Sequence, residues 1–338
     1  MEVSGGMLTD DEAIAGQWGA QLRHIDVGAV SLRVAVAGNG PLVILVHGFP
    51  ESWYSWRRQI EPLASAGFQV AVPDVRGYGG SDKPHPVSAY DMESLTGDIR
   101  GLARALSPQA QAVVIGHDWG APIAWNSALL FPEQFLAVAG LSVPYVPPGD
   151  VVAIDLFRKL FTDKGKFFYM VYFQDEGVAE AELEADPFVS IHQFYTCIAG
   201  DAPADAWPRN KLHGQRLFDG CHPPPLPRPW LDTGDVAYYA SQFAGSGFRG
   251  PLNRYRNFHR DNAFLKSRGD LVIHQPSLFI GGEKDMVNLM YPAGPVEAMK
   301  PYLSHLSAAH LIDGCGHWTQ QERPGRVNQI LIDWLRGL

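Results

Sequence analysis

The pentapeptide Gly116-His117-Asp118-Trp119-Gly120 is the feature that most narrows the folds open to this chain. It follows the apolar run Ala112–Ile115 and precedes the helical pattern Ile123–Leu130, with Pro122 suited to the first helical turn. A sharp turn from a strand into a helix needs small residues two positions either side of a strained central residue. The side chain of that residue then stands above the sheet at the N-terminus of the helix. The pattern therefore predicts a nucleophile elbow with Asp118 at its tip.

Short apolar runs near both ends of the chain indicate a buried sheet. They show little alternation, which is typical of strands covered on both faces in a mainly parallel sheet. Helical spacing lies between them, for example over Leu95–Leu106, so both ends of the chain are expected to form one α/β fold. The expected strands are Ser31–Ala37, Leu42–Val46, Gln69–Pro73, Ala112–Ile115, Leu136–Val143, Ser277–Ile280 and Ala309–Ile312.

The middle of the chain has a different pattern. Strand signals stop at about residue 146, and prolines, aromatic residues and helical patterns take over until about residue 260. Asp186 before Pro187 predicts the start of a helix, and the proline-rich stretch Cys221–Trp230 predicts an irregular loop. We therefore expect an α/β core of residues 1–145 and 261–338, with a helical lid of residues 146–260 inserted into it.

An aspartate at the tip of the elbow has chemical consequences, because most turns of this shape carry serine. A serine attacking a saturated carbon would leave an ether that water cannot readily cleave, whereas a carboxylate leaves an ester that an activated water can hydrolyse. With an ordinary pKa of about 3.9, Asp118 is ionised at pH 7. The residue type points to displacement at an epoxide or alkyl halide carbon. From the pentapeptide alone, a helix-capping Asp is the alternative.

The groups that would assist such a nucleophile follow other expected strands. His47-Gly48-Phe49-Pro50 comes directly after Leu42–Val46, where a loop can lend a backbone N–H to an oxyanion hole, and Pro50 suits a tight turn with a cis bond. We expect the oxyanion hole to consist of the Phe49 and Trp119 N–H groups. Alone, this tetrapeptide is a weak signal, because Gly-Pro turns after strands are common.

The general base should come late in the chain. His317 is the candidate, because it lies in the glycine-rich segment Gly314–Trp318, after the expected strand Ala309–Ile312. The acid that orients it should follow an earlier strand, which leaves Glu283 and Asp285, and we favour Asp285. His117 is expected either to be structural or to support a residue of the site without contacting the substrate.

Composition excludes several classes of partner. The chain has 27 Lys and Arg against 36 Asp and Glu and no basic run, which argues against nucleic acid. Asp10, Asp11 and Glu12 stand where an export signal would need basic residues, and every apolar run is far shorter than the roughly 20 residues that span a bilayer. Three cysteines without paired spacing favour free thiols in a reducing cytoplasm over a disulfide framework or a zinc site.

These motifs together resemble the soluble epoxide hydrolases of the α/β-hydrolase superfamily. The resemblance implies an α/β-hydrolase fold, a mainly parallel sheet flanked by helices with a helical lid, and hydrolysis of epoxides to vicinal diols without a metal or organic cofactor. The motifs are HGFPESWYSWR (His47–Arg57), RGYGGSD (Arg76–Asp82), GHDWGA (Gly116–Ala121), YFQDEGVAEAELE (Tyr172–Glu184), GPLNRYRN (Gly250–Asn257), GEKD (Gly282–Asp285) and GCGHW (Gly314–Trp318).

The resemblance also implies that two lid tyrosines, Tyr169 and Tyr255, bind the epoxide oxygen, beside Phe49 and Trp119. A phenol with a pKa of about 10 readily protonates an alkoxide about as basic as hydroxide. Tyr172 lies three residues from Tyr169 on the same helical face, so only the family pattern favours Tyr169. Arg254 stands where relatives often carry Trp: directed into the cleft, it would favour polar or acidic epoxides, and directed outward it would change nothing.

Two other functions stay open from the sequence. A haloalkane dehalogenase uses a similar Asp elbow, but Phe49 stands where those enzymes usually have Asn. A scaffold that only binds small molecules is the other alternative. Monomer and homodimer both stay open, as do detoxification, catabolism of an epoxide and lipid metabolism as physiological roles.

Overall fold

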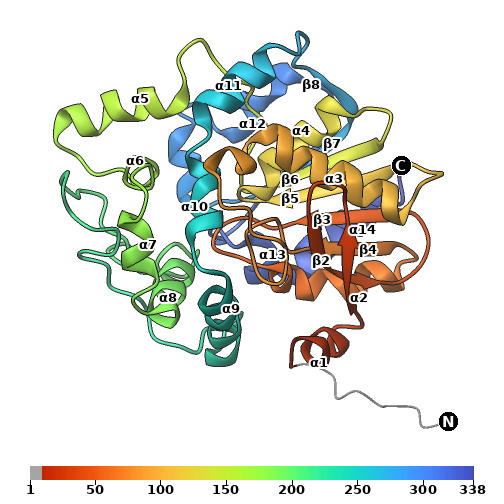
Figure 1. The fold of residues 1–338 in the computed structure, drawn as a ribbon, viewed down its shortest axis with the longest axis horizontal. Helices are drawn as coiled ribbons and strands as arrows, with labels where there is room; N and C mark the ends of the chain where they lie inside the picture. The colour runs from red at the N-terminus through yellow and green to blue at the C-terminus, as the bar shows by residue number, and fades with distance from the viewer. Residues whose placement is uncertain (1–9) are drawn as a thin grey trace.

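The chain folds around one eight-stranded sheet with a group of helices beyond one end of its strands (Figure 1). The computed structural model describes residues 10–338; residues 1–9, part of the N-terminal segment in which we expect no export signal, lie outside it. The strand order is β1-β2-β4-β3-β5-β6-β7-β8. The β1–β2 and β2–β4 pairs are antiparallel and the other five neighbouring pairs are parallel, which confirms the predicted α/β-hydrolase architecture.

All seven predicted strands are present, with small shifts at their ends. β1 was not predicted, because this edge strand is largely exposed and lacks an apolar run. The strands are β1 Gln21–Asp26, β2 Ser31–Ala37, β3 Leu42–Val46, β4 Gln69–Pro73, β5 Ala112–His117, β6 Phe135–Leu141, β7 Ile273–Gly282 and β8 Leu303–Ile312.

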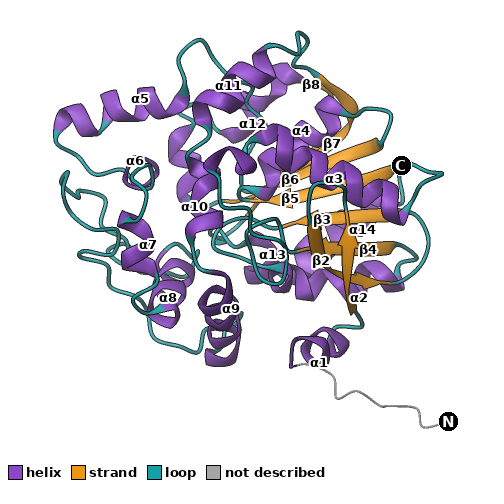
Figure 2. Ribbon diagram, viewed as in Figure 1, coloured by secondary structure: helices purple, strands orange, loops and turns teal. Residues whose placement is uncertain are grey.

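Strand β3 shows why the central runs are apolar without alternation. Its side chains point to opposite faces in turn, and both faces are covered. Leu42, Ile44 and Val46 belong to the core on one face, together with residues of α3 and α4. Val43 and Leu45 belong to the core on the other face, together with residues of α2 and α14. Figure 2 shows these helices flanking the sheet.

The helices of the core connect the strands and cover the sheet. The predicted helices at Leu95–Leu106 and Ile123–Leu130 correspond to α3 and α4. The core elements are α1 Asp10–Gln17, η1 Trp53–Trp56, α2 Arg57–Ser65, η2 Val87–Tyr90, α3 Met92–Leu106, α4 Gly120–Leu130, η4 Met286–Met290, α12 Pro295–Met299, η5 Lys300–Tyr302, α13 Thr319–Glu322 and α14 Pro324–Leu335.

The segment between β6 and β7 is helical and contains none of the eight strands. Its elements are α5 Ala153–Leu160, η3 Thr162–Lys164, α6 Tyr169–Tyr172, α7 Val178–Leu183, α8 Pro187–Cys197, α9 Thr233–Ser246, α10 Arg249–Tyr255 and α11 Phe258–Lys266. Asp186 caps α8 by accepting from Val189 N at 3.1 Å, as predicted, and residues 221–230 form loop. No helix in residues 10–338 is long and apolar enough to cross a membrane.

Candidate active site

The elbow between β5 and α4 presents Asp118 in a strained conformation. Its φ of 50° lies in the left-handed region that non-glycine residues rarely adopt. Two glycines make the turn possible: a Cβ on Gly116 would lie 1.9 Å from the Gly120 carbonyl oxygen, and one on Gly120 would lie 2.1 Å from the Val46 carbonyl oxygen. The backbone therefore packs too closely for any side chain at these two positions.

The loop after β3 binds one oxygen of the Asp118 carboxylate. The N–H of Phe49 donates to Asp118 Oδ1 at 2.7 Å, and the Phe49–Pro50 bond is cis. A Cβ on Gly48 would lie 2.3 Å from Asp118 Oδ1 and 2.7 Å from Trp119 N. Because Gly48 has no side chain, the two candidate oxyanion donors, the N–H groups of Phe49 and Trp119, can lie beside this carboxylate.

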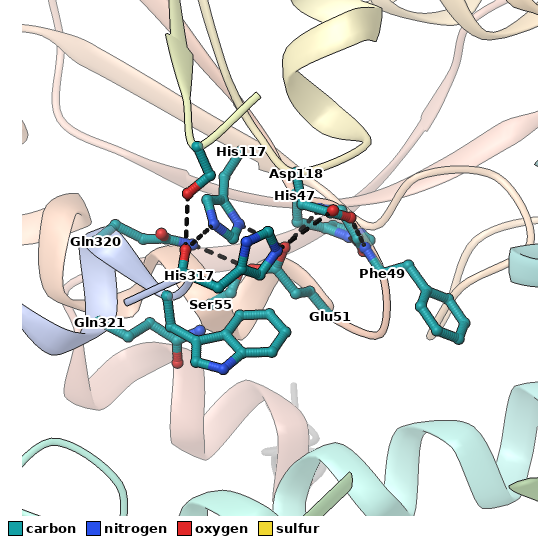
Figure 3. Close-up of polar contacts among 12 residues, drawn as sticks. His47, Phe49, Glu51, Ser55, His117, Asp118, His317, Gln320 and Gln321 are labelled. Atoms are coloured by element: carbon teal, nitrogen blue, oxygen red, sulfur yellow. Dashed lines mark hydrogen bonds and ion pairs between the residues drawn. The ribbon is translucent and has the colours of Figure 1, made fainter. Parts of the chain in front are cut away.

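The other carboxylate oxygen faces His317. His317 Nε2 lies 3.4 Å from Asp118 Oδ2, and its Nδ1 lies 3.1 Å from both oxygens of Asp285 (Figure 3 shows the His317 and Asp118 side chains). Asp285 is thus the acid that contacts His317, while Glu283 accepts instead from Gly314 N at 2.9 Å. A carboxylate on each side of the ring gives the imidazole one fixed orientation.

The charges of these groups reinforce one another. Burial opposes protonation of His317, but the charges and hydrogen bonds of Asp285 and Asp118 outweigh it and raise the pKa of His317 well above its usual range. Burial likewise opposes ionisation of Asp118, but the hydrogen bond and charge of His317, with His117 and the Phe49 N–H, lower the pKa of Asp118. Asp118 is therefore ionised at neutral pH, as a nucleophile must be.

Two tyrosines from the helical segment converge above Asp118. The rings of Tyr169 in α6 and Tyr255 in α10 lie 6.1 Å apart, and the negative charge of Asp118 contributes to the raised pKa of both, after burial as the largest cause. Tyr172 lies elsewhere, since its hydroxyl donates to Glu182 Oε2 at 2.6 Å. The structure therefore separates two tyrosines that helical spacing could not.

A buried carboxylate that sequence reasoning missed connects the loops of the site. Glu51 Oε1 accepts from Gly48 N and lies within hydrogen-bonding distance of His117 Nδ1, both at 2.8 Å, and Figure 3 shows Glu51 and His117 close to His317. His117 Nε2 in turn contacts the His317 carbonyl oxygen at 2.8 Å. The one sequence feature that could have pointed to Glu51 is its position directly after the His47–Pro50 loop.

The same carbonyl has a second partner. Ser142, a non-glycine residue with φ of 66° just after β6, donates its hydroxyl to the His317 carbonyl oxygen at 2.7 Å. The loop that carries His317 is thereby fixed by its backbone, independently of the imidazole. No sequence motif marked Ser142.

Comparison with protein families agrees with this architecture. The family model of the alpha/beta hydrolase fold matches residues 41–324. The chain is 41% identical over 319 residues to epoxide hydrolase A of Mycobacterium tuberculosis, covering 94% of this chain and 97% of that protein. It is 40% identical to bifunctional epoxide hydrolase 2 of Sus scrofa over 306 residues, and spans 53% of the length of that protein.

Solved structures give the same result. An epoxide hydrolase from an endophytic Streptomyces superposes with a TM-score of 0.90 at 45% identity, covering 94% of this chain and 96% of that one. Epoxide hydrolase A from Mycobacterium thermoresistibile superposes with a TM-score of 0.88 at 40% identity, covering 94% and 99%.

Proposed function

This chain belongs to the epoxide hydrolase family of the α/β-hydrolase superfamily, and from that premise we propose that Asp118 is the covalent nucleophile of its epoxide-opening reaction. Membership of this family favours epoxide hydrolysis over the dehalogenase and binding-protein alternatives. One observation carries the residue assignment. The two oxygens of Asp118 have different neighbours, the Phe49 N–H for Oδ1 and His317 for Oδ2, so one can stay in the oxyanion hole while the other reacts.

In the first step, Asp118 Oδ2 attacks a ring carbon of the epoxide. A C–O ester bond forms, the ring C–O bond breaks, and its electron pair goes to the ring oxygen, which takes a proton from Tyr169 or Tyr255. Both phenols remain protonated at neutral pH because burial raises their pKa values. They can therefore donate to the ring oxygen while negative charge develops on it.

In the second step, His317 takes a proton from water, and the water oxygen attacks Cγ of Asp118. The oxyanion that develops on Oδ1 is stabilised by the N–H groups of Phe49 and Trp119. The bond between Cγ and Oδ2 then breaks, and Oδ2 takes the remaining proton of the added water. The diol therefore leaves with Oδ2, and Asp118 keeps the oxygen from water as a carboxylate. The proton taken by His317 returns through solvent to the tyrosine that lost one.

We also propose the bounds of the lid, the class of substrate and the cellular compartment of this chain. We propose that residues 146–260 form the lid; its second boundary falls within α11, Phe258–Lys266. Epoxides are the substrates that the family implies. The formal charge of −9 supports the absence of nucleic acid as a partner, and the free thiols Cys197, Cys221 and Cys315 support a reducing, cytoplasmic setting.

Mass spectrometry of a trapped intermediate tests the residue assignment. The His317→Ala variant, mixed with an aryl epoxide, should gain the mass of one substrate on the peptide that contains Asp118. The matched control is the double variant Asp118→Ala/His317→Ala, which should gain none. An adduct on another peptide, or no adduct together with unimpaired diol formation, would refute these roles. Halide release from a matched alkyl bromide, assayed in parallel on the unaltered chain, should be negligible beside diol formation.

A further inference from the structure

Arg254, which directly precedes Tyr255 in α10, is buried, and both of its terminal nitrogens have protein partners, whereas its Nε has none. It is 4% exposed, its Nη1 donates to the Tyr90 carbonyl oxygen at 2.6 Å, and its Nη2 forms an ion pair with Asp261. Asp261 also accepts from Met92 N at 2.7 Å, at the start of α3. These contacts join α10 and α11 to the core segment that leads into α3.

The same guanidinium lies over a side chain of the nucleophile elbow. Its Cζ is 4.6 Å from the centroid of the Trp119 ring, which is the distance of a cation–π contact. Because both terminal nitrogens are occupied by Tyr90 and Asp261, Arg254 does not offer these donors to a polar or acidic substrate. The structural consequence of an arginine at position 254 therefore lies at Trp119.

Trp119 in turn packs against Tyr255. The two rings lie 5.2 Å apart at 87°, and Trp119 also packs against Phe258 at 5.9 Å. This edge-to-face contact fixes the direction in which the Tyr255 ring points. Burial raises the pKa of Tyr255, so its hydroxyl keeps its proton at neutral pH.

From these contacts we infer that Arg254 is a positioning residue for ring opening, acting on Tyr255 through Trp119. This inference rests on the proposed function of Tyr255 as a proton donor. A cation over the indole face holds the Trp119 ring in place, and the edge-to-face contact of that ring holds the ring of Tyr255. The Tyr255 hydroxyl is thereby oriented to donate its proton to the ring oxygen. Ester hydrolysis does not use this proton, so it should be insensitive to Arg254.

Single-turnover kinetics, with enzyme in excess over an aryl epoxide, separates the two steps. Quenched samples analysed by intact mass give the rates of ester formation and ester loss. Removing Arg254 alone would leave Asp261 buried without its partner, so the comparison is made in an Asp261→Asn background. The variants are Arg254→Gln/Asp261→Asn, which keeps a donor for the Tyr90 carbonyl, and Arg254→Lys/Asp261→Asn, which keeps a cation. Arg249→Gln is the control, because Arg249 is a partly exposed residue of the same helix that pairs with Glu176.

Relative to Asp261→Asn, the Gln variant should form the ester about tenfold more slowly and hydrolyse it within about twofold of the same rate. The Lys variant should recover part of the loss, and Arg249→Gln should match the unaltered chain. Equal rates of ester formation with Gln and Arg would overturn the inference. An equal slowing of both steps with a lower melting temperature would also overturn it, because that pattern is a purely structural effect. Absence of any ester on Asp118 in the unaltered chain would instead refute the proposed function.

Discussion

The Nε2 of His317 lies 3.4 Å from Oδ2 of Asp118, so the charge of His317 depends on the charge of Asp118. In the free enzyme, Asp285 and Asp118 both raise the pKa of His317. Esterification removes the charge of Asp118 and with it one of these two causes. The pKa of His317 then falls, and the imidazole becomes free to take a proton from water once the ester exists.

This coupling predicts different pH dependences for the two steps. Ester formation needs the Asp118 carboxylate, whose pKa is lowered, so it should persist to a pH below the ordinary value of about 3.9 for Asp. Ester hydrolysis needs neutral His317, so its rate should fall as the pH drops through the His317 pKa of the ester. The unaltered enzyme should therefore accumulate ester at pH 5 and not at pH 8, which intact mass of quenched samples measures. Equal ester levels at both values would contradict the coupling.

The tyrosine pair gives a second prediction. Tyr169→Phe and Tyr255→Phe should each slow ester formation by about tenfold to a hundredfold, because one of two proton donors to the ring oxygen is lost. Tyr172→Phe is the matched control, since the Tyr172 hydroxyl donates to Glu182 and not to the site. This variant should form the ester at a rate near that of the unaltered chain. Single-turnover rates measure all three. A loss in Tyr172→Phe as large as that in Tyr169→Phe would reverse the assignment.

Gly48→Ala tests the oxyanion hole without altering a polar side chain. The new Cβ would overlap Asp118 Oδ1 and Trp119 N, so the carboxylate or the loop must shift. We expect ester hydrolysis to fall by about a hundredfold to a thousandfold, the usual effect of losing one oxyanion donor. Gly97→Ala, at a position in α3 with no heavy atom within 4 Å of the new Cβ, is the control and should keep its activity. Normal hydrolysis by the Gly48 variant would argue against this oxyanion site.

Glu51→Gln should destabilise the fold. Burial opposes ionisation of Glu51, but the charge and hydrogen bond of His117 outweigh it and lower the pKa of Glu51. The ionised group therefore stabilises the protein above its unfolded pKa, and this contribution is lost as the pH falls through the folded pKa. A Gln side chain also lacks one of the acceptors that Gly48, His117 and Gln320 use, so we expect a loss of about 1–3 kcal/mol.

Urea unfolding of Glu51→Gln and the unaltered chain at several pH values measures this effect. The difference in the free energy of unfolding should be largest at neutral pH and shrink only below about pH 4.5, the ordinary pKa of Glu, as the pH falls through the lower pKa of folded Glu51. Glu283→Gln, a change at an exposed glutamate near the same loops, should cost far less. A difference that does not vary with pH would mean that the charge of Glu51 does not contribute.

Local sequence carried enough information to predict the sheet and the elbow. Gly116, Gly120 and the run before them constrain the backbone over only a few residues, and the apolar strands reflect burial on both faces. The positions of His317 and Asp285 also followed from strand order, because the carboxyl ends of parallel strands meet at one edge of a sheet.

Contacts between distant segments could not be predicted in the same way. Tyr169 differs from Tyr172 only in the direction each side chain takes from a short helix, which tertiary packing decides. Glu51 acts through partners up to 269 positions away, and β1 forms at an exposed edge without an apolar pattern. The contact of Arg254 with Trp119 likewise depends on how α10 packs over the elbow.

One isotope experiment tests the covalent role of Asp118 most directly. With enzyme in excess over an epoxide in ¹⁸O-water, the first turnover should release unlabelled diol, because the added oxygen comes from the carboxylate. The peptide that contains Asp118 should then carry one heavy oxygen. Labelled diol from the first turnover, with an unlabelled Asp118 peptide, would mean that water attacks the epoxide itself and that no ester forms on this residue.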